Sequence, residues 1–319
     1  MQSTSISMRI AAVLVADKRP DEDILDDVYR KYRDSHPFMP VTHFVDHSTM
    51  GPEALVAMGL GGKVPAWVSH HDVRLYEPTP TGIALPSQWR EAVGRQECHG
   101  DWLRYFDSEL STKPAVDVLA AWIERFSCDV GALLFHGLIR TAHAARALQH
   151  KESQARHAEL ARGLSLWAIG LRAGPPGKPT HQATDDDWAS EIMHCARAGA
   201  ATFIRKSTIP NLHLVTGPMA YLMVAHHLNS QTHSIAAAAF RQTHAKAIDT
   251  YESNKGAALS VALPSLDQPD LEALAARTDA HPAKLTEAAL RAYQATGDEL
   301  FLKAAARVQD YNLWRAMVG

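Results

Sequence analysis

The chain has 319 residues, of which 46% are hydrophobic and 21% are charged, as is ordinary for a soluble globular protein. A formal net charge of −3 and scattered basic residues give no reason to expect a nucleic-acid partner. No apolar run approaches the roughly 20 residues of a membrane span, and residues 10–16 are too short for a secretory signal. Three distant cysteines indicate neither a disulfide framework nor a thiolate metal site, so we expect a cytoplasmic protein without membrane contact.

Hydrophobic periodicity predicts helices along almost the whole chain, which places it in the all-α class with few or no strands. The helices expected in the first half cover residues 21–32, 52–60, 89–93 (with Ser87 as its N-cap), 100–110, 114–126, 132–148 and 152–171. Those expected in the second half cover residues 185–198, 210–228, 235–251, 271–277, 282–295 and 299–308. Only residues 10–15 and 73–76 are candidates for strands.

The only strong break in this series is a Gly/Pro-rich stretch over residues 173–180. We therefore expect a single domain over residues 1–319, built from two helical halves of approximately 1–172 and 181–319. The sequence contains no nucleotide-binding loop, no zinc-protease HExxH helix and no GxSxG nucleophile elbow.

The chain contains 18 histidines, an unusually large number. Five of them have polar or loop-like surroundings and are expected at the surface: His99, His150, His157, His181 and His233. The question is therefore which of the others converge.

Residues 135–148 carry the most informative histidines. The segment is small and apolar like a buried helix, yet it contains His136, Arg140 and His143, which need partners when buried. Seven positions separate the two histidines, so they share a helix face about 10 Å apart along the axis. As an isolated pair they fit a metal or catalytic site and a hydrogen-bonded polar core equally well.

Three further positions are ambiguous when each is taken alone. His47 precedes an apolar helix, where a core or capping role is the better interpretation, and His213 opens a helix in an apolar run. His281 and Lys284 lie three residues apart at a helix start, on one face. A lone lysine there would normally extend its amine to water.

These residues lie in blocks that resemble the questin oxidase-like family. Residues 136–148 (His-Gly-Leu-Ile-Arg-Thr-Ala-His-Ala-Ala-Arg-Ala-Leu) are similar to that family's most recognisable block, and residues 46–55 are similar to its Asn-His-x-Pro-Met block, with Asp46 replacing Asn and Thr49 replacing Pro. Further similar segments, in the same order, are residues 159–168, 213–216, 279–290 and those around Trp89 and Trp102. The resemblance extends from about residue 40 to residue 310.

The resemblance implies an α-helical oxygenase with a central ligand and metal cavity, which uses O₂ to cleave or oxidise a polycyclic aromatic or quinone polyketide. Some family members bind non-haem Fe(II) through histidines and a lysine carboxylated by CO₂. Carried over to this chain, His47, His136 and His143 would be ligands and Lys284 the carboxylated lysine. Either His213 or His281 would supply the remaining imidazole.

Imidazole nitrogen and carboxylate oxygen suit Fe(II) oxygenases, and burial favours the neutral amine that reacts with CO₂. Arg140 would then contact a substrate phenolate or form a structural ion pair. Two alternatives remain: a metal-free, NADPH-dependent oxygenase in which the histidines act as acids and bases, and a non-catalytic helical protein that binds small molecules. The partners expected are a small aromatic or quinone substrate and O₂.

Overall fold

The computed structural model describes residues 22–39, 44–71, 73–172, 188–253, 277 and 279–308. Within these ranges the regular elements are all helices, which confirms the all-α prediction. The predictions made for residues 10–15, 173–180 and 271–276, and for His181, lie outside the described residues.

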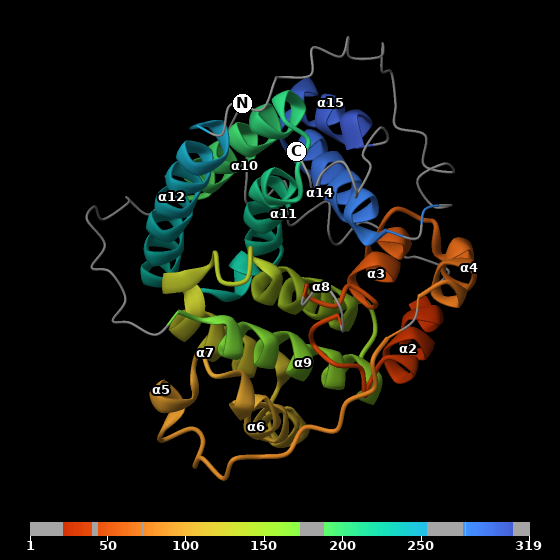
Figure 1. Cartoon of the computed structure of the whole chain (residues 1–319), viewed down its shortest axis with the longest axis vertical. Helices are drawn as coiled ribbons and strands as arrows, with labels where there is room; N and C mark the ends of the chain where they lie inside the picture. Colours follow the sequence, from red (N-terminus) through yellow and green to blue (C-terminus); the bar gives the residue numbers. More distant parts are fainter. Residues whose placement is uncertain are drawn as a thin grey trace.

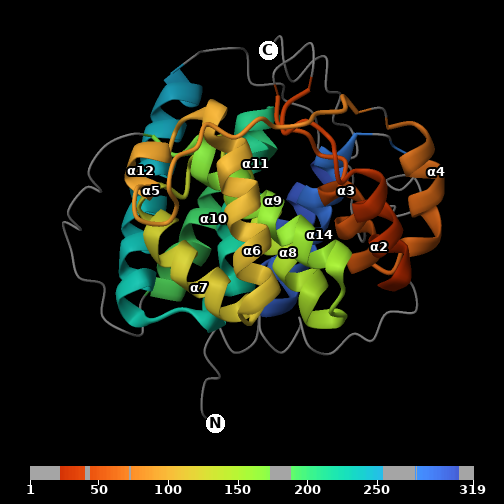
Figure 2. The ribbon, with the colours of Figure 1, turned by 90° about the horizontal axis from the view of Figure 1, so that it is seen from below.

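Within the described residues, the first half of the chain supplies eight helices. They are α2 (Glu22–Lys31), α3 (Met50–Ala57), α4 (Val64–Ser69), α5 (Trp89–Ala92), α6 (His99–Thr112), α7 (Ala115–Phe126), α8 (His136–His150) and α9 (Gln154–Gly170). Short 3₁₀ turns η1 (Gly61–Lys63), η2 (Gln96–Cys98) and η3 (Ser127–Asp129) join some of them. Figures 1 and 2 both place α2, α3 and α4 at one edge of the molecule and α12 at the opposite edge.

Among the residues that the structure describes, the second half contributes five helices and one 3₁₀ turn. They are α10 (Trp188–Arg205), α11 (Ile209–Val224), η4 (Ala225–His227), α12 (Ser230–Ser253), α14 (Ala280–Thr296) and α15 (Glu299–Arg307). Side chains cap four helix starts: Ser153 accepts from the amide of Arg156 at the start of α9, and Thr208, Asp279 and Asp298 cap α11, α14 and α15 in the same way.

Helix α11 passes through the centre of the molecule (Figure 1). All of its residues are buried except Pro210, which is partly exposed. Apolar residues predominate on every face of the helix, as expected of a helix enclosed by others. His213 is thus an ionisable side chain near the start of a helix that otherwise avoids charge. The main hydrophobic core contains residues of both halves, from Phe38 to Val308.

Glycines bring α8 and α9 into close contact, and the two helices run side by side (Figure 1). A Cβ atom added to Gly137 would lie 2.4 Å from the Cα atom of Trp167, and one added to Gly163 would lie 2.8 Å from the Cα atom of Thr141. The backbones of the two helices are therefore packed too tightly for side chains at these two positions.

Three local predictions fail. Residues 73–76 form no strand, because Leu75 makes only an isolated bridge with Ser35. Ser87 is not the N-cap of α5, which Gln88 precedes directly; the Ser87 hydroxyl donates to the carbonyl of Ala84 instead. Helix α8 begins at His136 rather than at residue 132, because the three preceding residues adopt the left-handed conformation.

None of the helices in the described ranges has both the length and the apolar character needed to cross a membrane.

Candidate metal centre

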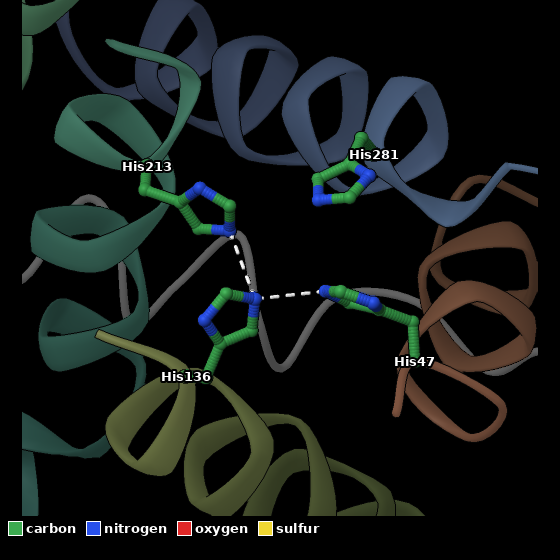
Figure 3. A group of neighbouring side chains, drawn as sticks. All are labelled: His47, His136, His213 and His281. Carbon is green, nitrogen blue, oxygen red and sulfur yellow. Dashed lines mark hydrogen bonds between the residues drawn. The ribbon is translucent and has the colours of Figure 1, made fainter. Parts of the chain in front are cut away.

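Four histidines from four different segments meet inside the protein. His136 begins α8, His213 is the fifth residue of α11, His281 lies in the first turn of α14, and His47 precedes α3 (Figure 3). One ring nitrogen from each lies within 4.8 Å of the others. Imidazoles bind transition metals at about 2.1 Å, so ligands on opposite sides of an ion are about 4.2 Å apart. Small side-chain movements would close the four rings around one ion.

Acceptor groups fix the orientation of three of these rings. The Nδ1 atom of His213 lies 2.8 Å from the carbonyl oxygen of Ile209, and that of His281 lies 2.7 Å from Oδ1 of Asp279. The Nδ1 atom of His136 contacts the carbonyl oxygen of Leu133 in the same way. A carbonyl or carboxylate oxygen only accepts hydrogen bonds, so each Nδ1 carries the proton and each Nε2 presents a lone pair.

These lone pairs point into a shared space. The Nε2 atoms of His136 and His213 are 3.1 Å apart, and those of His136 and His47 are 2.8 Å apart (Figure 3). The neutral pair of His136 and His213 has no proton to share, since both protons are held on Nδ1. A cation placed between the rings would convert this repulsion into coordination, as in metal sites whose imidazoles are oriented through their second nitrogen.

Burial keeps the four imidazoles neutral, which is the form that binds metals. Loss of hydration lowers the pKa of His47, His136, His213 and His281, and the charge of Lys284 lowers each of them further. At neutral pH the cluster therefore consists of uncharged rings.

A strained turn positions His136. Leu133, Leu134 and Phe135 have φ angles of 50°, 54° and 65°, in the left-handed region that costs a non-glycine residue roughly 1–2 kcal/mol. This turn places the carbonyl oxygen of Leu133 against His136 Nδ1 and ends directly at the first residue of α8. Three consecutive residues of this kind are stored strain next to the cluster, as is common at functional sites.

Lys284 lies one helical turn after His281, on the same face of α14. Its side chain is buried, and its Nζ atom makes no hydrogen bond within the part of the chain that the structure describes. Burial lowers the pKa of this amine from 10.5 to about 7. The prediction that Lys284 extends to water when considered alone is therefore wrong.

His143 is not brought into the cluster. Its Nδ1 atom lies 2.6 Å from Oε2 of Glu53, and the four-histidine group does not include it. The rise of the helix is the reason, because two residues seven positions apart are separated by about 10 Å along the axis, far beyond the span of one coordination sphere. The sequence left open whether His213 or His281 supplies the remaining imidazole, and the structure places both in the group.

Glu53 and His143 belong to a buried network of charges that links the elements carrying the histidines. Arg146 of α8 donates to Glu53 of α3 and to Glu287 of α14. Arg291 donates to Glu287 over 2.9 Å and to the carbonyl oxygen of Met219 in α11 over 2.8 Å. Burial alone would raise the pKa of Glu287, but Arg146 and Arg291 outweigh it and hold that pKa at about 2. The network thus consists of compensated charges that hold α3, α8, α11 and α14 together.

Sequence reasoning missed this network. The signal available was the spacing of four between Glu287 and Arg291, but nothing in the sequence connects either of them to Arg146, 141 positions away from Glu287.

Arg140 forms an ion pair with Glu159 of α9. Its Nε and Nη2 atoms donate to the two carboxylate oxygens over 2.7 and 3.0 Å, and Thr49 donates to the same carboxylate. Both side chains are buried. Of the two roles left open for Arg140, the geometry gives direct support to the structural ion pair.

Two of the histidines expected at the surface are buried instead. His99 is 3% exposed and packs against the ring of Tyr76, and His233 is 7% exposed and stacks on Trp188. His157 is partly exposed, and its ring pairs with Glu152.

Comparison of the sequence with known protein families and with curated proteins finds no match in either case.

Proposed function

We propose that the protein is a metal-dependent oxygenase of the questin oxidase-like type, with non-haem Fe(II) held by His47, His136, His213 and His281. The observation that carries the proposal is the convergence of four imidazoles, three of which are buried and have Nε2 lone pairs fixed by acceptors on Nδ1. Imidazole ligands suit iron, zinc, copper and nickel alike. The choice of iron rests on the resemblance of the ligand-bearing blocks to that family.

Charge balance gives Lys284 its role. Four neutral imidazoles leave the two positive charges of a buried divalent ion uncompensated, and such a charge needs an anionic partner. A neutral amine reacts with CO₂ to form a carbamate and release one proton, and the pKa of about 7 makes the neutral form of Lys284 abundant. The carboxylated side chain would supply the missing negative oxygen ligand.

The chain's own residues would prepare the centre in three ways. Leu133 and Ile209 hold the rings of His136 and His213 through their carbonyl oxygens, and Asp279 holds His281. The ion-pair network keeps the four ligand-bearing segments in register, and the surrounding helices exclude water from the rings. When bound, iron would supply O₂ activation and electron transfer to or from an aromatic substrate.

The decisive experiment is metal analysis of protein purified without air and reconstituted with Fe(II). We expect about one equivalent of iron, and loss of most of it in the His213→Ala variant but not in the His157→Ala control. Less than about a tenth of an equivalent of any transition metal in the wild-type protein would overturn the proposed centre.

Oxygen consumption with a panel of hydroxylated anthraquinones tests the reaction itself. Uptake that requires both iron and the aromatic compound supports the oxygenase. Uptake by iron-free protein that depends on NADPH would instead identify a metal-free oxygenase, and bound iron without uptake on any aromatic compound would leave the oxygenase proposal without support.

A further inference from the structure

A groove of about 470 Å³ lies between the starts of α8 and α11 and one face of α12. This volume falls within the range of about 300–1,000 Å³ that small-molecule sites occupy. Its apolar wall includes Leu134, Phe135, Pro210 and Leu214, and its opposite wall includes Thr243 and Lys246 of α12.

The charged residues that line this groove are all basic. They are Arg172 and Lys246, and no acidic residue lines it. Arg172 is paired with Asp129, whereas Lys246 has no ion-pair partner in the described ranges. Another groove of the molecule, with a volume of about 730 Å³, differs in charge, because Asp107 and Glu152 line it together with Arg30 and Arg33. The groove beside α12 is thus complementary to a ligand that is both apolar and anionic.

Leu134 is a second indication of a binding site. It has a left-handed φ angle of 54°, and its apolar side chain is 38% exposed. Strain and apolar exposure both carry a free-energy cost, and their coincidence at one residue of a cavity wall indicates a contact surface for a ligand.

The same wall is continuous with the residues that orient two histidines. Leu134 and Phe135 directly follow Leu133, whose carbonyl oxygen contacts His136. Pro210 directly follows Ile209, whose carbonyl oxygen contacts His213. A molecule seated in the groove therefore touches both of the turns that set the orientation of these imidazoles.

We propose that this groove binds a planar aromatic anion, with its rings against Leu134, Phe135 and Pro210 and its negative group at Lys246, and that occupancy is transmitted to His136 and His213. The site is distinct from the proposed metal centre. Its ligand binding can be measured on full-length protein whether or not metal is present.

The probe for binding is 8-anilino-1-naphthalenesulfonate, an aromatic sulfonate whose fluorescence rises in apolar surroundings. We expect Lys246→Gln to raise the dissociation constant about fivefold, which is the effect expected for the loss of one exposed charge. Lys246→Arg should retain most of the affinity. Ala247→Trp, which fills the groove from α12, should abolish binding at this site. Lys303→Gln, at an exposed lysine of α15 outside the groove, is the matched control.

Equal dissociation constants for the wild-type, Lys246→Gln and Ala247→Trp proteins would overturn the site. So would an equal loss of affinity in the Lys303→Gln control. Failure of the proposed oxygenase would appear differently, as absent metal or absent oxygen uptake with probe binding intact.

Transmission to the histidines is tested by ¹H–¹⁵N correlation spectra of the imidazole rings in metal-free protein. Saturation with the probe should shift the resonances of His136 and His213 but not those of His157, and Ala247→Trp should remove the shifts. Probe binding without these shifts would overturn the link. Oxygen uptake by Ala247→Trp shows whether the natural ligand of the groove is the substrate of the proposed oxygenase. Loss of uptake with full metal content would mean that it is the substrate, and retained uptake would mean that it is a separate effector.

Discussion

The imidazole of His143 lies 2.6 Å from the carboxylate of Glu53, although His143 shares a helix face with His136. The two histidines therefore have different surroundings, since His136 belongs to the four-histidine cluster and His143 to the ion-pair network. We expect His136→Gln to lose most of the bound iron and His143→Gln to retain close to one equivalent. Metal analysis of the two purified variants measures this, and equal loss of metal in both would restore His143 as a ligand.

Arg146 is expected to be the residue of the network most sensitive to substitution. Arg146→Met leaves the carboxylates of Glu53 and Glu287 buried without their shared partner, which should lower the free energy of unfolding by about 3–5 kcal/mol. Denaturant unfolding followed by circular dichroism measures the change.

The control for this prediction is Arg197→Met, which removes an exposed pair with Asp298 and should cost less than about 1 kcal/mol. Similar losses in the two variants would show that the network contributes no more than a surface ion pair.

Gly137→Ala should destabilise the protein although alanine favours helices. The added Cβ atom would lie 2.4 Å from the Cα atom of Trp167, and backbone cannot move aside as a flexible side chain can. We expect a net loss of about 2 kcal/mol in the free energy of unfolding, with weaker metal binding because His136 is the adjacent residue. Gly62→Ala, whose Cβ atom would have no neighbour within 4 Å among the described residues, should be nearly neutral.

Lys284 makes the stability of the metal-free protein depend on pH. In the unfolded chain its amine is protonated below its ordinary pKa of 10.5, whereas in the folded chain it loses the proton above about pH 7. Between these values the unfolded state binds the additional proton, so the free energy of unfolding contributed by this group rises with pH.

Lys284→Met should therefore stabilise the metal-free protein at pH 7, by on the order of 3 kcal/mol, and this advantage should disappear above pH 10.5. Unfolding of both proteins in CO₂-free buffer with a chelator, over this pH range, provides the measurement. A constant difference between the two proteins across the range would contradict a buried, titrating amine.

Helical periodicity predicted most of the helices, but it gave no helix at α4 and placed the start of α8 four residues too early. Gly131 to Phe135 has the composition of a helix, and the left-handed angles at residues 133–135 arise from tertiary contacts that sequence periodicity does not contain. Phe135, for example, packs on Phe240 and against Gly217, more than 80 positions further along the chain.

The site could be predicted in part. The family resemblance predicts His47, His136 and Lys284, with either His213 or His281 as the remaining imidazole, and the structure brings all four histidines together near Lys284. Spacing alone could not separate His143 from the clustered histidines. A shared helix face fixes the direction of two side chains, whereas the distance along the axis decides whether they reach the same ion.

The acceptors that orient the rings determine how readily mutation can alter the centre. Those facing His136 and His213 are main-chain carbonyl oxygens, which every residue at positions 133 and 209 would supply. Only the acceptor facing His281 is a side chain, that of Asp279. Among these three orienting contacts, single substitutions in the gene can remove only the one at position 279. Variation in the electron-donating strength of these imidazoles would therefore enter natural or laboratory-evolved variants chiefly through that residue.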